Sequence, residues 1–435
     1  MKFNKICILG LGYIGLPTAS MFAANGIQVL GVDINPNVIE TLRTGGIHIH
    51  EPGLPDMVAT VIQSGALTMA TAPAEADAFI IAVPTPFKDG EFGVYNGETY
   101  RLADMRAVTA AAEAITPHLR KGNLVVLEST SPPRTTVDLV APILEKSGLK
   151  AGVDFHLVYS PERVLPGQLL RELVENDRVT GGITPESAQA ASDLYAVFVK
   201  GEIIQTTATT AEMVKLMENA YRDVNIAIAN EFSRLADRFG VDVWEAIQLA
   251  NHHPRVKIHN PGPGVGGHCV SVDPWFFVEG APDLSRLIAK ARQVNDLQPV
   301  FVVETIQKAI GELRGKKIAA LGLAFKPDVD DLRESPAVEV IHLLTKAGAI
   351  VKAFEPFKPA AVLPGVDAVQ TLELAVKDAD AIILLVNHTQ FRQLSAEELK
   401  TITPARILFD TVNGWRRQDW AAHGFALFRL GVGMS

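Results

Sequence analysis

Cys269 and Asp273 lie four residues apart in a glycine-rich stretch that runs from Asn260 to Pro274. This stretch suits neither a helix nor a central strand, so we expect a loop that can wrap closely around a ligand. A thiol beside a cation ionises to a thiolate, which is a strong nucleophile. Cys269 is therefore a candidate nucleophile, although a cysteine packed in a structural loop is the usual case. His268 is assigned no catalytic role, because a single loop histidine more often packs or contacts substrate.

A second polar group follows helical spacing. Lys215, Asn219 and Arg222 are separated by four and then three residues, so they share one face of a helix. Such a face can be exposed to solvent or can line a cleft, and both readings stay open at this point. A single amide between two cations makes a cleft as credible as a solvated face.

Gly10, Gly12 and Gly15 form a Gly-x-Gly-x-x-Gly pattern between an expected strand and an expected helix. The first glycine allows a tight turn, the second lets a pyrophosphate approach the backbone, and the third permits close helix–strand packing. Asp33 ends the next strand and can accept hydrogen bonds from ribose hydroxyls, which favours NAD over NADP. FAD, or a tight turn that binds nothing, remains as an alternative.

The elements that must position these residues are alternating strands and helices. This alternation predicts a doubly wound, mostly parallel α/β sheet. Polar groups follow several expected strands, at the end where such sheets bind ligands. The expected strands are 3–9, 28–32, 78–83, 123–127 and 155–159, with helices at about 15–25 and 101–119.

The middle of the chain has a different pattern, with expected helices at 210–240, 243–251 and 284–313. A second α/β unit follows, with expected elements at 317–323, 336–347, 350–354, 381–386 and 407–411. We therefore expect two Rossmann-like domains joined by a long central helix and a helical middle domain. The predicted boundaries are 1–208 for dinucleotide binding, 209–313 for the helical domain with the cysteine loop, and 314–435 for the second α/β domain.

The composition of the chain excludes several classes of protein. The chain has 435 residues, 48% hydrophobic and 20% charged, which excludes a mainly disordered chain, collagen and a coiled coil. A net charge of -9 disfavours nucleic acid as a partner, and the apolar runs are too short to span a membrane. Two cysteines indicate a reduced, cytoplasmic protein, and glycines interrupt an N-terminus that weakly resembles a signal peptide. No metal site is expected.

Several motifs together resemble the UDP-glucose/GDP-mannose dehydrogenase family along the whole chain. They are Gly10-x-Gly12-x-x-Gly15, Val83-Pro84-Thr85-Pro86, Ser129-Thr130, Ser160-Pro161-Glu162, Lys215 with Asn219, Gly266-Gly267-x-Cys269-x-x-x-Asp273, Phe325-Lys326-Pro327 and Arg333-x-Ser335-Pro336. The resemblance implies two successive NAD-dependent oxidations of a nucleotide sugar at C6, from alcohol to carboxylate.

The resemblance also implies the catalytic roles. Lys215 and Asp273 would hold a water that takes the C6 hydroxyl proton, and Cys269 would attack the aldehyde. Lys215 and Asn219 would stabilise the oxyanion of the thiohemiacetal. Glu162 or Asp273 would act as the base in hydrolysis of the thioester.

Binding residues are implied in the same way. Contacts with the cofactor are implied for Gly10, Gly12, Tyr13, Ile14, Gly15, Asp33, Thr85 and Thr130. Contacts with the substrate are implied for Arg163, Val164, Lys215, Asn219, Arg222, Arg255, His259, Gly266, Lys326 and Arg333. Because the family's counterpart of Arg255 reaches the substrate of a neighbouring subunit, we expect a homo-oligomer.

The residues around the cysteine differ from those of the UDP-glucose members. The stretch Gly-Gly-His-Cys-Val-Ser-Val-Asp-Pro-Trp-Phe resembles the branch that acts on UDP-N-acetylhexosamines. UDP-N-acetyl-D-mannosamine is the expected substrate, ahead of UDP-N-acetylglucosamine and then UDP-glucose. A two-electron 3-hydroxyacid dehydrogenase would need neither Cys269 nor a second α/β domain, and a non-catalytic nucleotide-binding protein would not need the polar groups.

Overall fold

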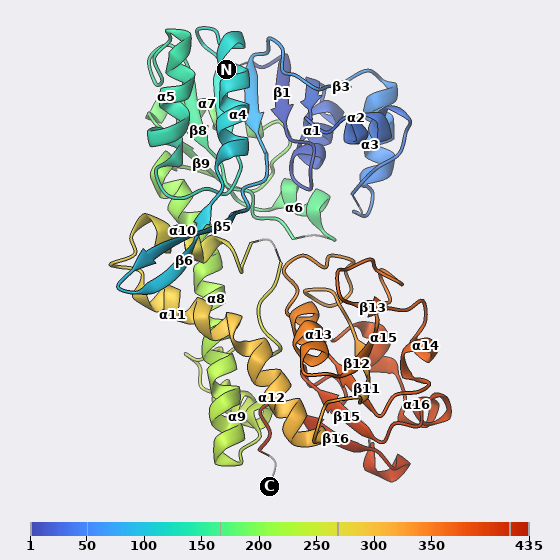
Figure 1. The fold of residues 1–435 in the computed structure, drawn as a ribbon. Coiled ribbons are helices and arrows are strands. Elements are labelled where there is room, and N and C mark those ends of the chain that lie inside the picture. Colours follow the sequence, from blue (N-terminus) through green and yellow to red (C-terminus); the bar gives the residue numbers. More distant parts are fainter. Residues whose placement is uncertain (1, 50, 166, 268, 417–418, 434–435) are drawn as a thin grey trace. The chain divides into compact units, whose positions relative to one another are not determined.

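The computed structural model describes residues 2–49, 51–165, 167–267, 269–416 and 419–433. They form two compact units, drawn in Figure 1. One unit comprises Met1–Glu218 and Trp275–Leu284, and the other comprises Asn219–Pro274 and Ser285–Ser435. The predicted three-part division stays a prediction. Among the described residues, no helix has both the length and the apolar composition that crossing a membrane requires.

The first unit is built on an eight-stranded sheet with the order β10-β9-β8-β7-β4-β1-β2-β3. The strands are β1 (Lys5–Leu9), β2 (Gln28–Val32), β3 (Leu67–Ala70), β4 (Ala78–Ile81), β7 (Leu124–Leu127), β8 (His156–Tyr159), β9 (Arg178–Gly182) and β10 (Ile203–Thr207). All neighbouring pairs are parallel except β8 and β9. The predicted mostly parallel α/β sheet is therefore confirmed for this unit.

Alternate residues of these strands enter two different cores, as the period of two requires. Ile6 and Ile8 of β1 pack with helices α1 (Gly15–Ala24), α3 (Leu54–Gln63), α6 (Leu169–Glu175) and α7 (Pro185–Tyr195). Cys7 and Leu9 pack with α4 (Arg106–Ile115), α5 (Ala141–Leu144) and the first turn of α8 (Ala208–Phe239). A short helix α2 (Pro36–Arg43) follows β2. Both faces of the sheet are thus covered by helices.

The expected helix over 101–119 is wrong at its beginning. Residues 98–103 form β6 (Glu98–Ala103), which pairs in antiparallel register with β5 (Phe87–Tyr95). Helix α4 begins only at Arg106, and Asp104 accepts hydrogen bonds from the backbone and side chain of Arg106 at this boundary. The antiparallel hairpin was not predicted: its strands carry many polar residues and glycines, and the Asn96-Gly97 turn that favours a hairpin was overlooked.

The second unit contains α9 (Val243–Ala250), most of α8 and a six-stranded parallel sheet with the order β13-β12-β11-β14-β15-β16. Its strands are β11 (Lys317–Leu321), β12 (Ile350–Phe354), β13 (Asp367–Ala368), β14 (Ala381–Leu384), β15 (Ile407–Asp410) and β16 (Ala426–Arg429). One core contains α12 (Gln298–Ile310) and α13 (Pro336–Lys346). The other contains α14 (Leu372–Val376), α15 (Thr389–Gln393) and α16 (Ala396–Ile402).

The single helix expected over 284–313 is two helices. Helix α11 (Arg286–Asp296) has Leu297 as its C-cap residue, and α12 begins at Gln298 with Pro299 in its first turn. Proline is compatible with a first helical turn but not with a helix interior. The long helix α8, in contrast, agrees with the prediction, and α10 (Asp273–Gly280) follows the cysteine loop.

Candidate active site

The glycine turn of the first unit has the geometry of a phosphate-binding loop. Gly10 has φ +93°, and a Cβ there would lie 2.4 Å from the Ala82 carbonyl oxygen. A Cβ at Gly15 would lie 1.8 Å from the Gly10 carbonyl oxygen, whereas one at Gly12 would have no atom within 4 Å. The open space at Gly12 therefore fits the approach of a pyrophosphate.

Tyr13 and Ile14 lead from this turn into α1 and are half-buried. Ile14 is the N-cap of α1, and no side chain caps the helix. The first N–H groups of a helix attract anions when no side chain satisfies them. This end of α1 therefore suits the phosphates of a dinucleotide.

Asp33 lies directly after β2 and is held beside the glycine turn. Its Oδ2 accepts a hydrogen bond from the Leu11 N–H at 3.0 Å, and its Oδ1 accepts one from the Asn35 N–H at 2.9 Å. The side chain is only half-buried. Each carboxylate oxygen can accept a further hydrogen bond, as a ribose contact would require.

The structure brings together the two predicted cofactor threonines. The Thr85 hydroxyl donates to the Thr130 carbonyl oxygen at 2.7 Å, and the Ser129 hydroxyl donates to the Val83 carbonyl oxygen at 2.7 Å. These contacts join the segments that follow β4 and β7. Both segments leave the carboxyl ends of parallel strands, where ligands bind in such folds.

Glu162 and Lys215 also come together in the first unit. The Lys215 ammonium donates to the Glu162 backbone carbonyl at 2.9 Å, and Lys215 is 9% exposed. The Glu162 carboxylate accepts hydrogen bonds from the Arg163 N–H at 2.7 Å and from Arg178 Nη1 at 3.1 Å. Arg163 itself pairs with Glu218 at 2.8 Å, and Val164 packs against the core.

A buried group next to Glu162 was not predicted from the sequence. Arg178 Nη2 and the Tyr195 hydroxyl both donate to Glu128 Oε1, at 2.6 and 2.5 Å. The Arg178 guanidinium lies 3.7 Å from the centre of the Tyr195 ring. Arg178 therefore links Glu128, which follows β7, to Glu162, which follows β8. The only sequence signal was the position of Glu128 after a predicted strand.

Burial dominates the electrostatics of Glu128 and raises the pKa of its carboxyl group to about 7, although the Arg178 cation opposes this shift. Its Oε2 atom is buried and has no hydrogen-bond partner within the described ranges. Carboxyl groups whose pKa is shifted toward neutrality by burial are common at functional sites.

In the second unit, Asn219 and Asp273 form one buried group. The Asn219 amide donates to Asp273 Oδ2 at 2.5 Å, and the Asp273 carboxylate is 1% exposed. The Asp273 N–H donates to the Cys269 carbonyl at 2.8 Å, so one backbone turn joins the predicted nucleophile and the predicted base. Cys269 is half-buried, whereas Arg222 is exposed. Lys215 lies on α8, one turn before Asn219.

The glycines before Cys269 permit close packing against the second α/β sheet's loops. A Cβ at Gly266 would lie 2.4 Å from the Glu334 carbonyl oxygen, and one at Gly267 would lie 2.9 Å from the Phe325 ring. The Gly267 N–H also donates to the Arg333 carbonyl at 3.1 Å. The structure thus brings together three of the predicted motifs, those around Gly266, Phe325 and Arg333.

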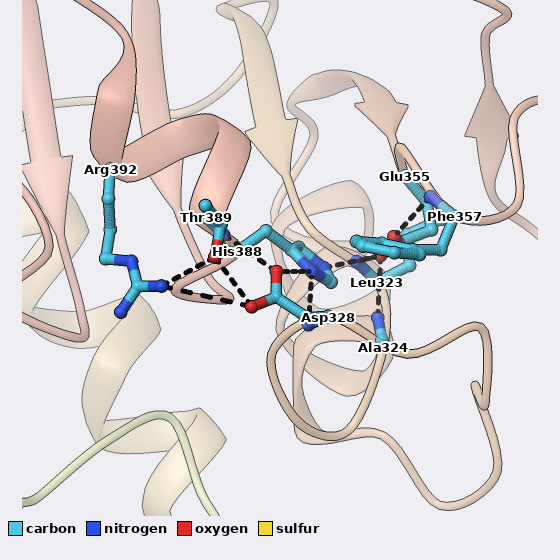
Figure 2. Close-up of polar contacts among 8 residues, drawn as sticks. All are labelled: Leu323, Ala324, Asp328, Glu355, Phe357, His388, Thr389 and Arg392. Atoms are coloured by element: carbon cyan, nitrogen blue, oxygen red, sulfur yellow. Dashed lines mark hydrogen bonds and ion pairs between the residues drawn. The ribbon is translucent and has the colours of Figure 1, made fainter. Parts of the chain in front are cut away.

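The two cations of the Phe325 and Arg333 motifs have partners nearby. The Arg333 guanidinium pairs with Asp331 at 2.7 Å, and the Lys326 ammonium lies 5.8 Å from the Phe325 ring centre. Lys326 lies in the loop after β11. Glu355 accepts a hydrogen bond from Leu323 at one end of this loop, and His388 accepts one from Asp328 at the other end (Figure 2).

Two predicted substrate residues lie apart from these groups. Arg255 and His259 are exposed and lie in the segment 251–260, where Asn251 and Ile258 bond to each other. Their predicted contacts with substrate stay predictions. His268 lies outside the described residues.

Comparison with known proteins gives a consistent result over the whole chain. Residues 4–199 match the NAD binding domain of the UDP-glucose/GDP-mannose dehydrogenase family, 209–297 match its central domain, and 319–417 match its UDP binding domain. The UDP-N-acetyl-D-mannosamine dehydrogenase of Campylobacter jejuni is 48% identical, over 92% of this chain and 98% of that one. An NDP-N-acetyl-D-galactosaminuronic acid dehydrogenase of Ralstonia nicotianae is 46% identical, over 97% and 99%.

Solved structures agree with this result. A UDP-D-ManNAc dehydrogenase from Pyrococcus horikoshii has a TM-score of 0.89 and 40% identity, covering 99% of both chains. A UDP-N-acetyl-mannosamine dehydrogenase from Staphylococcus aureus has a TM-score of 0.88 and 43% identity, covering 98% of this chain and 99% of that one. The resemblance inferred from the motifs is confirmed: the chain belongs to the UDP-glucose/GDP-mannose dehydrogenase family, and its N-terminal domain binds NAD.

Proposed function

We propose that this protein oxidises the C6 hydroxyl of a UDP-N-acetylhexosamine to a carboxylate in two NAD-dependent steps, with UDP-N-acetyl-D-mannosamine as the substrate. The observation that carries the proposal is full-length similarity, at 40–48% identity, to proteins named as dehydrogenases of that sugar nucleotide. The second α/β sheet and the UDP binding domain also count against a two-electron hydroxyacid dehydrogenase, which would need neither.

The sugar is the least constrained part of the proposal. UDP-N-acetylglucosamine is the first alternative and UDP-glucose the second. The Ralstonia relative adds an N-acetylgalactosamine nucleotide to the sugars worth testing, because its name includes galactosaminuronic acid. Contacts around C2 distinguish the first three sugars, and contacts around C4 distinguish N-acetylgalactosamine from N-acetylglucosamine.

The site residues fit the chemistry as follows. Asp273, with Lys215, would hold the water that takes the C6 hydroxyl proton. NAD, when bound in the first unit, accepts one hydride in each oxidation. Cys269 would attack the aldehyde carbon, and the Lys215 and Asn219 donors would stabilise the oxyanion that forms. Loss of the second hydride leaves a thioester on Cys269, and water activated by Glu162 or Asp273 would release the carboxylate and restore the thiol.

We further propose a cytoplasmic homo-oligomer with three functional parts, 1–208, 209–313 and 314–435. The low cysteine content supports a reducing compartment. An exposed apolar stripe on α8 supports association between copies of the chain.

The deciding experiment measures the NADH formed per nucleotide sugar consumed, with the UDP derivatives of N-acetylmannosamine, N-acetylglucosamine, N-acetylgalactosamine and glucose in parallel. We expect two NADH per UDP-N-acetyl-D-mannosamine and a much lower kcat/KM for the others. Two NADH with a different preferred sugar would retain the mechanism and change the substrate. One NADH per sugar would contradict the thioester route through Cys269.

A further inference from the structure

A fully buried carboxylate–imidazole pair lies in the second unit. Glu355 directly follows β12 and is 1% exposed, and His388 directly precedes α15 and is 0% exposed. His388 Nε2 lies 3.1 Å from Glu355 Oε2. The rings of Phe357 and Phe391 pack on the imidazole, with centroids at 5.2 and 5.6 Å. Buried polar groups need hydrogen-bond partners. The Phe357 N–H supplies one to Glu355 Oε1, and the other backbone partners of this pair belong to a single loop.

That loop is the segment 323–328, which leaves β11. Glu355 Oε2 accepts hydrogen bonds from the N–H groups of Leu323 and Ala324, at 2.8 and 2.9 Å (Figure 2). At the other end, the Asp328 N–H donates to His388 Nδ1 at 2.9 Å. Because Nδ1 accepts, the neutral ring carries its proton on Nε2 and donates it to Glu355. One pair of side chains therefore fixes both ends of the segment.

Asp328 has an unusual backbone that this arrangement maintains. Its φ is +60°, a left-handed conformation that few residues other than glycine adopt. Its carboxylate accepts hydrogen bonds from the Thr389 N–H at 2.8 Å and the Thr389 hydroxyl at 2.7 Å (Figure 2). Thr389 begins α15 and follows His388. The main chain and the side chain of Asp328 are thus held by adjacent residues.

Between the two fixed ends lie Phe325, Lys326 and Pro327. The Phe325 ring occupies the space that a side chain at Gly267 would need, two residues before Cys269. Lys326 is the cation of this segment, and the whole segment lies within the part of the chain that matches the family's UDP binding domain. The segment follows the carboxyl end of a central parallel strand, where ligands bind in such sheets.

We infer that His388 and Glu355 are positioning residues for a nucleoside diphosphate: they fix the backbone of 323–328 so that Lys326 is presented to the diphosphate before it binds. This inference rests on the proposed function, which makes the ligand a UDP-sugar. A binding segment that is already ordered loses less conformational entropy when the ligand arrives. The hydrogen bonds from His388 and from the backbone also lower the pKa of Glu355 despite its burial, so the carboxylate stays an acceptor for the loop.

Two substitutions of His388 separate its two contacts. In His388→Gln the amide can still reach Glu355, but the acceptor for the Asp328 N–H is lost. In His388→Asn the amide oxygen can still accept from Asp328, but the contact with Glu355 is lost. We expect His388→Gln to raise the Kd for UDP and the KM for the nucleotide sugar about tenfold, the effect of losing roughly one good interaction. We expect a smaller change, about threefold or less, in His388→Asn, and an unchanged KM for NAD in both.

A double-mutant cycle tests whether the effect acts through Lys326. Lys326→Met should weaken UDP binding, and adding His388→Gln to it should then cause little further loss. The control is His342→Asn. His342 is a half-buried histidine of the same unit that contacts the Pro364 carbonyl, and the variant should bind UDP like the wild type. Isothermal titration measures the Kd for UDP of each of these variants, without turnover.

A folded His388→Gln protein that binds UDP within twofold of the wild type would overturn the inference, as would fully additive losses in the cycle. If His388→Gln does not fold, Asp328→Ala serves instead. Asp328 is exposed, and its substitution removes the hydrogen bonds with Thr389 that hold the same end of the segment. Its Kd for UDP should also rise, and an unchanged Kd would overturn the inference. A wild-type protein that does not bind UDP would instead refute the proposed function.

Discussion

The two cysteines lie in environments that favour opposite chemistry. Cys7 is fully buried in β1, and burial raises the pKa of its thiol to about 11, so it stays protonated and unreactive. Cys269 is half-buried in a loop joined by a backbone hydrogen bond to Asp273. A nucleophilic thiol needs access to its substrate, and of these two cysteines only Cys269 is accessible.

Cys269→Ala should therefore abolish carboxylate formation, by at least about a thousandfold in kcat, since covalent catalysis would be removed. The first oxidation needs no thiol, so at most one NADH should form per sugar. Rapid-quench analysis of products, with NADH absorbance, measures both steps. Cys7→Ala is the matched control and should still give two NADH per sugar. Carboxylate formation by Cys269→Ala at a near wild-type rate would refute the nucleophile assignment.

Glu128 makes the stability of the first unit depend on pH. Its pKa is raised from 4.5 to about 7, mainly by burial, so between these values the folded state holds a proton that the unfolded state has lost. The contribution of Glu128 to the free energy of unfolding then falls as pH rises from about 4.5 to about 7, and levels off above that range. Glu128→Gln removes this titration and keeps an acceptor for Arg178 and Tyr195.

Urea unfolding of wild type and Glu128→Gln at pH 5 and pH 8 tests this dependence. The stability of the wild type relative to Glu128→Gln should be lower at pH 8 than at pH 5, because only the wild type must bury a carboxylate there. Glu186→Gln, at an exposed position in the first turn of α7, serves as the control and should show no such difference. The opposite order at the two pH values would show that the Arg178 ion pair, and not burial, dominates.

At the scale of elements, α8 carries Lys215 and Asn219 between two buried anchors. Near its start, Glu212 accepts hydrogen bonds from the N–H groups of Arg134 and Thr136, at 2.6 and 2.7 Å. Further along, Asp223 accepts a hydrogen bond from Asn295 at 2.8 Å and pairs with Arg292 of α11. These side chains fix the rotation of the helix, which decides where its functional residues point.

Arg292→Met should destabilise the second unit by about 3 kcal/mol, because it leaves the buried Asp223 carboxylate without its cation. Chemical denaturation, followed by circular dichroism, measures this loss. Lys308→Met is the control, since Lys308 pairs with Asp237 at 3.4 Å on the surface and should contribute less than about 1 kcal/mol. Equal effects of the two substitutions would contradict the anchoring role of Arg292.

The elements also show what the sequence could predict. The β1–α1–β2 unit follows from local signals, since Gly10, Gly15 and Asp33 each satisfy a requirement of the turn that holds them. The β5–β6 hairpin carries little apolar alternation, but its two-residue turn, Asn96-Gly97, is a local hairpin signal that the strand prediction did not use. Arg178 could not be assigned, because its partners Glu128 and Tyr195 are far along the chain and only the sheet order brings them together. The Glu355–His388 pair was missed for the same reason.

At the scale of the whole molecule, α8 presents an apolar stripe that a single chain leaves exposed. The helix has 32 residues and is therefore about 48 Å long. Its large exposed apolar side chains recur every three, four or seven residues, so they share one face. They are Met213, Met217, Tyr221, Ile228, Phe232, Leu235 and Phe239, each 39–72% exposed. Contiguous exposed apolar surface of this kind marks association sites in proteins.

We therefore expect a homo-oligomer in which α8 forms an interface, and Ile228→Glu with Phe232→Glu should convert it to monomers. Both positions are exposed, so the fold of a single chain should lose little stability, whereas four new charges in a two-fold interface would each lose their solvation. Light scattering after size exclusion gives the mass. Val362→Glu, at a 98% exposed position outside the stripe, is the control and should leave the mass unchanged. If the double variant keeps the wild-type mass, α8 is not the interface. If it becomes monomeric and also loses activity, this result supports the expectation that Arg255 contacts the substrate of a neighbouring subunit.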